Sequence, residues 1–352
     1  MITNGSKIPT SSDNLDVYYN RKGTQSQTRA LRDFHNLYIK RRLIKGVSQN
    51  GDILMDTSVG KAGDLNKWID ANLSFILGID ISIDNIENKL DGACARYLKT
   101  KMKNRNIPRV LFLQGNSGLN IRSGQGLYSE KGKQIINALF DKGPKDEKVL
   151  GKGVYKNFGI AKNGFNIIST QFALHYFFEN KHTCNAFLRN VSECCKVGGY
   201  FIGTCYDGKK IFRLLEEKKQ GESISKLNKG QKIWEVEKMY DKNDFNDNET
   251  SFGYAINVYQ ESINKTFKEY LVNFNYLSIL LENYGFAKVT DTEARELGLG
   301  HSVTSFSDYF TMMQNEITSN ERVNNAYGNS AKMSPEEKSV SFLNNCFVFK
   351  KI

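Results

Sequence analysis

The segment Asp56–Asp64 carries carboxylates at both ends and two glycines between them. It follows the apolar run Ile53–Met55, which predicts a buried strand, and it precedes a helical pattern of apolar residues that begins at Leu65. Glycine at positions 60 and 63 allows a sharp turn and close approach to a ligand. A strand, a glycine turn and a helix in this order are typical of a nucleotide- or cofactor-binding α/β unit.

The ligand of this turn is predicted to carry positive charge. The G-x-G-x-x-G spacing that rests a pyrophosphate on a helix N-terminus is absent, and carboxylates suit phosphate poorly. Asp64 also stands where a helix N-cap belongs. The next apolar run, Phe75–Ile81, contains Asp80 at the position that binds a ribose diol in dinucleotide folds. The ammonium, sulfonium and ribose of S-adenosylmethionine fit this pattern.

Length and composition indicate a globular protein with excess positive charge. The 352 residues suffice for one large domain with insertions. The net charge of +11 favours a polyanion such as nucleic acid, although a lysine-rich solvated surface would give the same value. No run of eighteen apolar residues and no signal peptide is present, so we expect an intracellular protein without a membrane segment. The six cysteines form no C-x-x-C pair, and we expect neither disulfides nor a metal site.

Apolar runs alternate with helical patterns, which predicts an α/β fold with a mostly parallel sheet. The predicted strands are 53–55, 75–81, 109–114, 165–171, 199–205, 288–291 and 345–350, with a hairpin within 252–274. The predicted helices are 24–44, 83–102, 172–191 and 276–284. Three stretches lack a clear pattern and are predicted to be insertions: 118–163, which includes a short helix near 135–140, 218–250, and 296–338.

Five segments together resemble the messenger-RNA cap guanine-N7 methyltransferases. Residues Gln171–Glu179 read QFALHYFFE and closely resemble the Q-F-x-x-H-Y-x-F-E signature of that family. Four further segments are similar and occur in the family's order: Asn20 with Phe34–Lys40, Asp56–Trp68, Gly203–Thr204 with Asp207–Gly208, and Glu269–Val272. The resemblance covers the chain from about Tyr18 to its end.

The resemblance implies a class I S-adenosylmethionine-dependent methyltransferase with a Rossmann-like, mostly parallel seven-stranded sheet. Residues 1–46 would form an N-terminal extension whose helix contributes to the active site, and residues 47–352 the methyltransferase domain with its three insertions. The implied activity is methyl transfer to N7 of the GpppN cap, without a metal or a general base. The insertions look similar to those of large DNA viruses, where the methyltransferase can end a longer capping protein.

The implied partners are the capped 5′ end of mRNA and, in a larger assembly, other capping-enzyme domains or a stimulatory subunit. The implied location is the host cytoplasm for a viral protein and the nucleus for a cellular one. No membrane association is implied.

For the cofactor, the resemblance implies Lys40 at the carboxylate, Asp80 at the ribose, and Asn116 with Ser117 at the adenine. The full implied set is Lys40, Asp56, Ser58, Gly60, Asp64, Asp80, Asn116, Ser117, Gln171 and Tyr176. Two positions depart from the family, which usually has Asp where Asn116 stands and Gly where Ser58 stands.

For the cap, the resemblance implies contacts with the guanosine and with the triphosphate. The guanine and its ribose would meet His35, Asn36, His175, Tyr176 and Glu269. The triphosphate would meet Lys61, Lys67 and Arg96. Two looser candidates stand near family tyrosine positions: Tyr254 and Asn344.

Several of these side chains also have purely structural interpretations. They are helix caps for Asp64 and Ser117, core positions for Trp68, Phe172, Phe178 and His175, solvated charges for Lys61 and Lys67, and an edge-strand acid for Glu269. Two other functions also stay open. One is a non-catalytic RNA-binding subunit, and the other is a methyltransferase for internal RNA or a small molecule.

Overall fold

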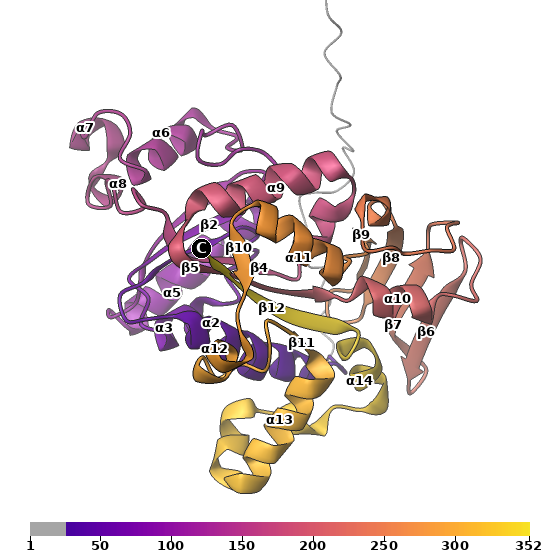
Figure 1. Cartoon of the computed structure of the whole chain (residues 1–352). Coiled ribbons are helices and arrows are strands. Elements are labelled where there is room, and N and C mark those ends of the chain that lie inside the picture. Colours follow the sequence, from indigo (N-terminus) through magenta and orange to yellow (C-terminus); the bar gives the residue numbers. More distant parts are fainter. Residues whose placement is uncertain (1–25) are drawn as a thin grey trace, which may run out of the picture.

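The computed structural model describes residues 26–352 and is built on one central sheet (Figure 1). Its strand order is β10-β12-β5-β4-β1-β2-β3, and β11 pairs with β12 as an eighth strand. Asn20, one of the residues that carry the resemblance, lies outside the described residues. The strands are β1 (Ile53–Asp56), β2 (Phe75–Asp80), β3 (Arg109–Gln114), β4 (Phe165–Gln171), β5 (Cys195–Tyr206), β10 (Phe286–Lys288), β11 (Val303–Ser305) and β12 (Asn344–Lys351).

The first five strands run parallel, and β12 reverses direction beside β5. Strands β10 and β11 are antiparallel to β12. The expected mostly parallel α/β sheet is confirmed, with the short β11 as an additional strand. The strand predicted at 288–291 is wrong in its bounds, since β10 ends at Lys288. Because the five parallel strands share one direction, the loops after β1, β2, β3 and β4 gather at one edge of the sheet.

Both faces of the sheet are buried, which explains why β1 and β2 are continuous apolar runs. Leu54 packs in the core on one face with the N-terminal helices, α3 (Leu65–Asp70) and α13 (Phe306–Ser319). Met55 packs in the core on the other face with α6 (Glu130–Leu139), α9 (Lys181–Cys194) and α11 (Phe274–Asn283). This alternation follows from the two-residue period of a strand.

The N-terminal helix is confirmed but has an unusual interior. It consists of α1 (Arg29–Asp33), a π-helical segment η1 (Phe34–Lys40) and α2 (Arg41–Val47). It therefore begins and ends later than the predicted 24–44. π-Helical turns are rare and occur frequently at functional sites.

The helix predicted over 83–102 is wrong as a single element. Two helices occur instead, α4 (Ile83–Glu87) and α5 (Ala93–Lys103). Gly92 directly precedes α5. A Cβ atom at this position would lie 2.6 Å from the Asn88 nitrogen, so the backbone packs closely against itself there. The helix predicted from 172 likewise begins as a 3₁₀ turn, η2 (Leu174–Phe178), before α9.

The prediction that 218–250 is irregular is also wrong. This stretch supplies β6 (Ser223–Asn228) and β7 (Gln231–Lys238), which join the predicted hairpin, β8 (Ala255–Gln260) and β9 (Lys265–Tyr270). Together they form a four-stranded antiparallel sheet in the order β6-β7-β8-β9. Its many charged residues hid the strands because one face of an antiparallel sheet can remain solvated.

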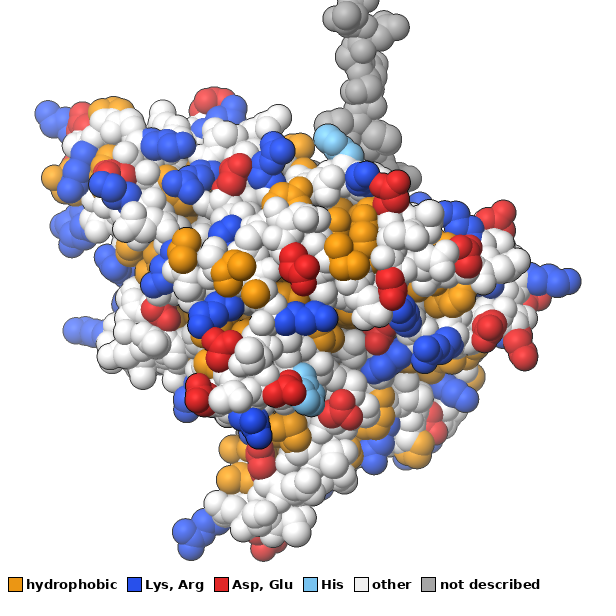
Figure 2. All heavy atoms as spheres, in the orientation of Figure 1, with side chains coloured by type: hydrophobic (Ala, Val, Ile, Leu, Met, Phe, Trp, Pro, Cys, Tyr) orange, Lys and Arg blue, Asp and Glu red, His pale blue; other side chains and the backbone are white. Residues whose placement is uncertain are grey.

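The regular structure of the other two insertions is mostly helical. Residues 118–163 hold α6, α7 (Glu147–Leu150) and α8 (Lys152–Tyr155), and residues 296–338 hold β11, α13 and the 3₁₀ turns η4 (Glu321–Tyr327) and η5 (Ser330–Lys332). The remaining elements are α10 (Gly208–Leu214), η3 (Glu249–Ser251), α12 (Asp291–Glu296) and α14 (Pro335–Ser341). Figure 2 shows Lys and Arg side chains gathered over α6–α8.

Within residues 26–352, no helix is long and apolar enough to cross a bilayer. The same residues contain no group of three or more His, Cys, Asp or Glu side chains arranged to hold a metal ion. All six cysteines are free thiols.

Candidate active site

Hydrogen bonds tie together the loops that follow β1, β2 and β3. The Gly60 amide donates to Asp80 Oδ2 at 2.7 Å, and Gly60 adopts a positive φ of 53°. The Ser117 hydroxyl donates to the Thr57 carbonyl at 2.7 Å. Asn116 stands beside it and accepts the Gly118 amide at 2.8 Å. Ser117 is therefore a cross-link between loops and not a helix cap.

Asp80 anchors the end of β2 through three donors. Besides Gly60, it accepts the Ser82 amide and the Asn85 side-chain amide, each at 3.0 Å. Burial raises the pKa of Asp80, although these hydrogen bonds lower it. The carboxylate is thus held in a fixed orientation at the position expected for a ribose ligand.

Asp64 forms the centre of a buried ion network and does not cap α3. Lys40 Nζ and Lys67 Nζ each lie 2.8 Å from Asp64 Oδ1. Burial alone would raise the pKa of Asp64, but the two ammonium groups together hold it well below its ordinary value. Lys67 also donates to Asn36 Oδ1 at 3.3 Å and has its pKa lowered by burial. Lys67, expected at the cap triphosphate, is only 5% exposed and lies inside this network.

Asp56 is a buried acid of a different kind. It accepts the Ser58 amide at 3.1 Å and is 2% exposed. Burial, followed by the nearby charge of Asp64, raises the pKa of Asp56 to about 8. A cationic ligand would favour its ionised form.

The end of β4 is held by a threonine that the sequence interpretation gave no role. Thr204 Oγ1 donates to Gln171 Oε1 at 3.1 Å and accepts the Phe172 amide at 3.1 Å. Phe172 has a positive φ of 53°, a strained conformation for an aromatic residue. Its half-buried ring stacks on His35 with centroids 5.3 Å apart, and Lys40 Nζ lies 5.9 Å from the ring centroid. Phe172 thus contacts both parts of the expected site.

His175 and Glu269 meet in a buried position. His175 Nδ1 lies 3.6 Å from Glu269 Oε2, too far for a hydrogen bond. Among the described residues, neither imidazole nitrogen nor Glu269 Oε2 has a hydrogen-bond partner. Burial lowers the pKa of His175 to about 3 and raises that of Glu269 to about 8. The Tyr176 ring packs edge-on against His175, with centroids 4.2 Å apart.

The π-helical segment turns His35 and Asn36 inward, but both have protein partners. His35 Nε2 hydrogen-bonds to the Ser341 hydroxyl at 2.8 Å, and burial lowers the pKa of His35 to about 3. Asn36 donates to the Arg32 carbonyl at 2.9 Å while it accepts from Lys67.

Lys61 and Arg96 converge on Asp91, in the loop between α4 and α5. Lys61 Nζ lies 2.7 Å from Asp91 Oδ1 and 3.4 Å from Asp84 Oδ2. Arg96 Nε donates to the Asp91 carbonyl at 2.9 Å. The two cations expected at the triphosphate therefore lie together.

The two looser candidates, Tyr254 and Asn344, make contacts with other parts of the protein. Tyr254 packs in an aromatic cluster with Phe212, Tyr240 and Phe245, and its hydroxyl donates to the Asp244 carbonyl. Asn344 is buried and donates to the carbonyls of Val340 and Ser341. Both side chains are buried in protein contacts, and their assignment to the cap site stays a prediction. Trp68 and Phe178 are core residues.

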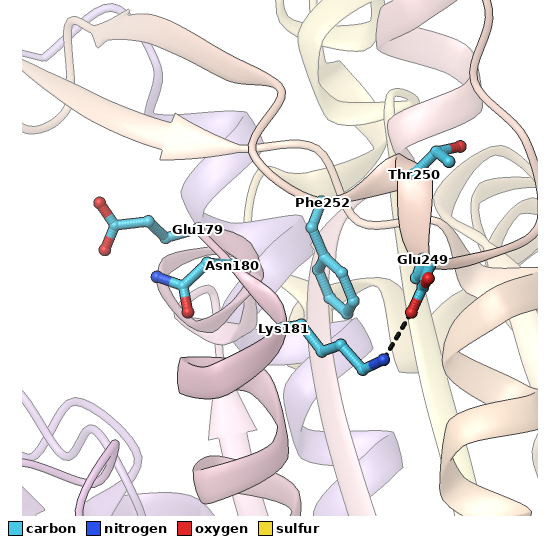
Figure 3. Close-up of a pocket in the computed structure, with 6 residues that line it drawn as sticks. All are labelled: Glu179, Asn180, Lys181, Glu249, Thr250 and Phe252. Carbon is cyan, nitrogen blue, oxygen red and sulfur yellow. Dashed lines mark hydrogen bonds and ion pairs between the residues drawn. The ribbon is translucent and has the colours of Figure 1, made fainter.

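A surface pocket of about 550 Å³ lies beside the start of α9, separate from these residues (Figure 3). Lys181 and Glu249 form an ion pair across it, and the Phe252 ring lines it. None of the expected site residues lines this pocket, and its exposed ion pair gives no reason to place chemistry there.

Two groups of buried polar side chains therefore lie among these elements: the ion network around Asp64 and the His175–Glu269 pair. The sheet order, with these groups at its carboxyl edge, defines a class I S-adenosylmethionine-dependent methyltransferase. A family model described as the mRNA (guanine-N(7))-methyltransferase domain matches residues 12–352. The chain belongs to that family.

The chain is also similar to several individual proteins. The chain is 27% identical to the "Probable mRNA-capping enzyme" of Acanthamoeba polyphaga mimivirus over 87% of its length, and spans 25% of that protein. It is 27% identical to the mRNA cap guanine-N(7) methyltransferases of Candida glabrata and Saccharomyces cerevisiae, over 94% and 92% of this chain and 69% and 64% of those proteins. A solved S-adenosylmethionine-dependent methyltransferase from Clostridium acetobutylicum ATCC 824 aligns with TM-score 0.43 and 11% identity, over 94% of this chain and 93% of that chain.

Proposed function

We propose that this protein transfers a methyl group from S-adenosylmethionine to N7 of the guanine in a GpppN mRNA cap. The observation that carries the proposal is the buried His175–Glu269 pair, whose facing polar atoms lack hydrogen-bond partners among the described residues. Such groups are costly unless a ligand completes them. The base edge of guanine offers two donors, N1–H and the N2 amino group, and one acceptor, O6. Glu269 can accept from the donors, and a neutral His175 can donate to O6.

The donor set around Asp64 fits S-adenosylmethionine, which supplies an electrophilic methyl group on a cationic sulfonium when bound. Asp56 and Asp64 carry carboxylates for its ammonium, and Lys40 carries a cation for its carboxylate. The fixed carboxylate of Asp80 would accept from the ribose hydroxyls, and Asn116 and Ser117 would lie at the adenine. The side-chain amide of Asn116 can both accept and donate hydrogen bonds at the adenine.

The chain needs no general base for this reaction, because N7 has a lone pair and no proton to remove. An imidazole with a pKa near 3 is a weak base, so His175 serves to orient the guanine. Glu269 gains stabilisation as the guanine ring becomes positive, which favours the transition state over the bound substrate. Holding both ligands in line supplies the remaining acceleration.

The proposal is tested by methyl transfer from radiolabelled S-adenosylmethionine to GpppA, followed by nuclease digestion. We expect the label in N7-methylguanosine. ApppA is the matched control, because adenine has an acceptor at N1 where guanine has a donor. Two acceptors, adenine N1 and the Glu269 carboxylate, would then face each other. Label in an internal nucleotide, or equal labelling of ApppA, would contradict the proposal. Binding of S-adenosylhomocysteine without any transfer would favour the non-catalytic alternative.

The substrate in the cell would be the capped 5′ end of a transcript. Because the mimivirus relative is four times longer than the matched region, we also propose that this module can work beside other capping domains.

A further inference from the structure

Helix α5 contains Arg96, one of the two cations assigned to the triphosphate, and carries further basic side chains along its length. Residues 92–109 contain six basic side chains and no acidic one. The basic insertion 118–163 is different, since its nine basic residues are mixed with four acidic ones. The basic residues of this stretch, which has no acidic side chain, therefore begin at the site with Arg96.

Three of these cations share one face of α5. Arg96, Lys99 and Lys103 are spaced at i, i+3 and i+7, which aligns them along the helix. They span about 10.5 Å at the usual rise of 1.5 Å per residue. Lys99 and Lys103 are exposed, while Arg96 is half-buried beside Asp91.

The stability of the helix explains the position of only one of these cations. Lysines in the last turn, such as Lys103, interact favourably with the helix dipole. Arg96 occupies the first turn, where a cation is unfavourable and where α5 has no acidic residue. Lys99 Nζ also reaches back to the Leu90 carbonyl, toward the same loop that holds Lys61. Arg96 and Lys99 thus place positive charge at the end of α5 that adjoins the site.

We infer that this face of α5, defined by Arg96, Lys99 and Lys103, binds the phosphates of the first nucleotides that follow the cap. The inference rests on the proposed function, because it continues the path of the cap triphosphate from Lys61 and Arg96. Charge complementarity identifies the occupant as a single RNA strand. The enzyme then recognises capped RNA more strongly than the isolated cap dinucleotide.

The experiment compares Lys99→Glu/Lys103→Glu with the wild type on GpppA and on a capped 20-nucleotide RNA that begins with A. The quantity measured is the ratio of kcat/KM for capped RNA to kcat/KM for GpppA. For a single strand, one phosphate contact strengthens binding about fivefold when the salt concentration falls from about 1 M to 0.1 M. Loss of two contacts should therefore lower the ratio on the order of 20-fold at 0.1 M salt. The slope of log KM against log salt should drop by about 1.4 for the same reason.

The matched control reverses two exposed lysines of the 118–163 insertion, Lys148→Glu/Lys152→Glu, and should leave the ratio unchanged. An unchanged ratio in the α5 variant, or an equal fall in the control, overturns the inference. Fluorescence anisotropy with a labelled capped RNA measures the same contacts without catalysis. A wild type that binds this RNA through α5 but does not methylate GpppA would refute the proposed function alone. Lys99→Ala/Lys103→Ala replaces the charge-reversal variant if that variant misfolds.

Discussion

His175 Nδ1 lies 3.6 Å from Glu269 Oε2, and both atoms are buried without a hydrogen-bond partner among the described residues. The pKa of His175 is lowered to about 3 and that of Glu269 is raised to about 8, so both groups are mainly neutral at pH 7 in the free protein. A ligand that donates two hydrogen bonds to Glu269 would favour its ionised form. The pair is therefore suited to a base that places donors at Glu269 and an acceptor at His175.

Glu269→Gln should lower kcat/KM for GpppA on the order of 100-fold, because a carboxylate that accepts two hydrogen bonds is replaced by a neutral amide. Affinity for S-adenosylhomocysteine, measured by calorimetry, should stay within twofold. Glu282→Gln, an exposed acid on α11, is the matched control and should change neither value. Equal loss of transfer and cofactor affinity in Glu269→Gln would place Glu269 outside the cap site.

The same substitution should stabilise the protein at alkaline pH. Burial raises the pKa of Glu269 from 4.5 to about 8, so the folded state retains a proton that the unfolded chain releases in this range. Stability therefore falls as pH rises between these values, by up to about 1.4 kcal/mol per pH unit. Glutamine has no such proton, and Glu269→Gln should exceed the wild type in Tm at pH 8 by an amount that shrinks toward pH 4.5. A constant difference in Tm across thermal melts from pH 4.5 to 8.5 would contradict this.

Thr204→Val should impair both ligands at once. The variant keeps the side-chain shape but removes the hydroxyl that donates to Gln171 and is one of the two acceptors of the Phe172 amide, at a cost of about 1–3 kcal/mol. The Phe172 amide keeps its 2.8 Å hydrogen bond to the Thr204 carbonyl, so the variant should weaken the stacking of Phe172 on His35 without releasing it. We expect higher KM values for both S-adenosylmethionine and GpppA, and recovery in Thr204→Ser. Failure of serine to restore them would show that packing, and not the hydroxyl, matters at this position.

Lys67→Met should destabilise the protein and weaken cap binding more than cofactor binding. It removes one of two cations from Asp64 and the donor to Asn36, whereas Lys40 still pairs with Asp64. We expect a loss of about 1–3 kcal/mol in urea unfolding, less than for a buried pair broken completely. Lys45→Met, an exposed lysine on α2, should have little effect. Equal stability of the two variants would mean that Lys67 is not needed in the network.

The strands were the most predictable part of the fold. β3 and β4 coincide with the predicted 109–114 and 165–171, because each contains a short apolar run of the length typical of a strand. The hairpin and the helix that ends before Gly285 are likewise confirmed. The break before Gly92 and the strands β6 and β7 were missed, since close backbone approach and half-solvated strands leave little trace in hydrophobic periodicity.

By itself, the sequence determined the α/β class and the concentration of carboxylates and glycines at strand ends. These properties are local, because burial and turn geometry are set by neighbouring residues. Only the tertiary structure decided how those groups are used: Asp64 binds two lysines instead of capping a helix, and His175 meets Glu269 from a distant strand. Periodicity reports which side of an element is buried, but the partner of a polar group depends on how separate elements pack.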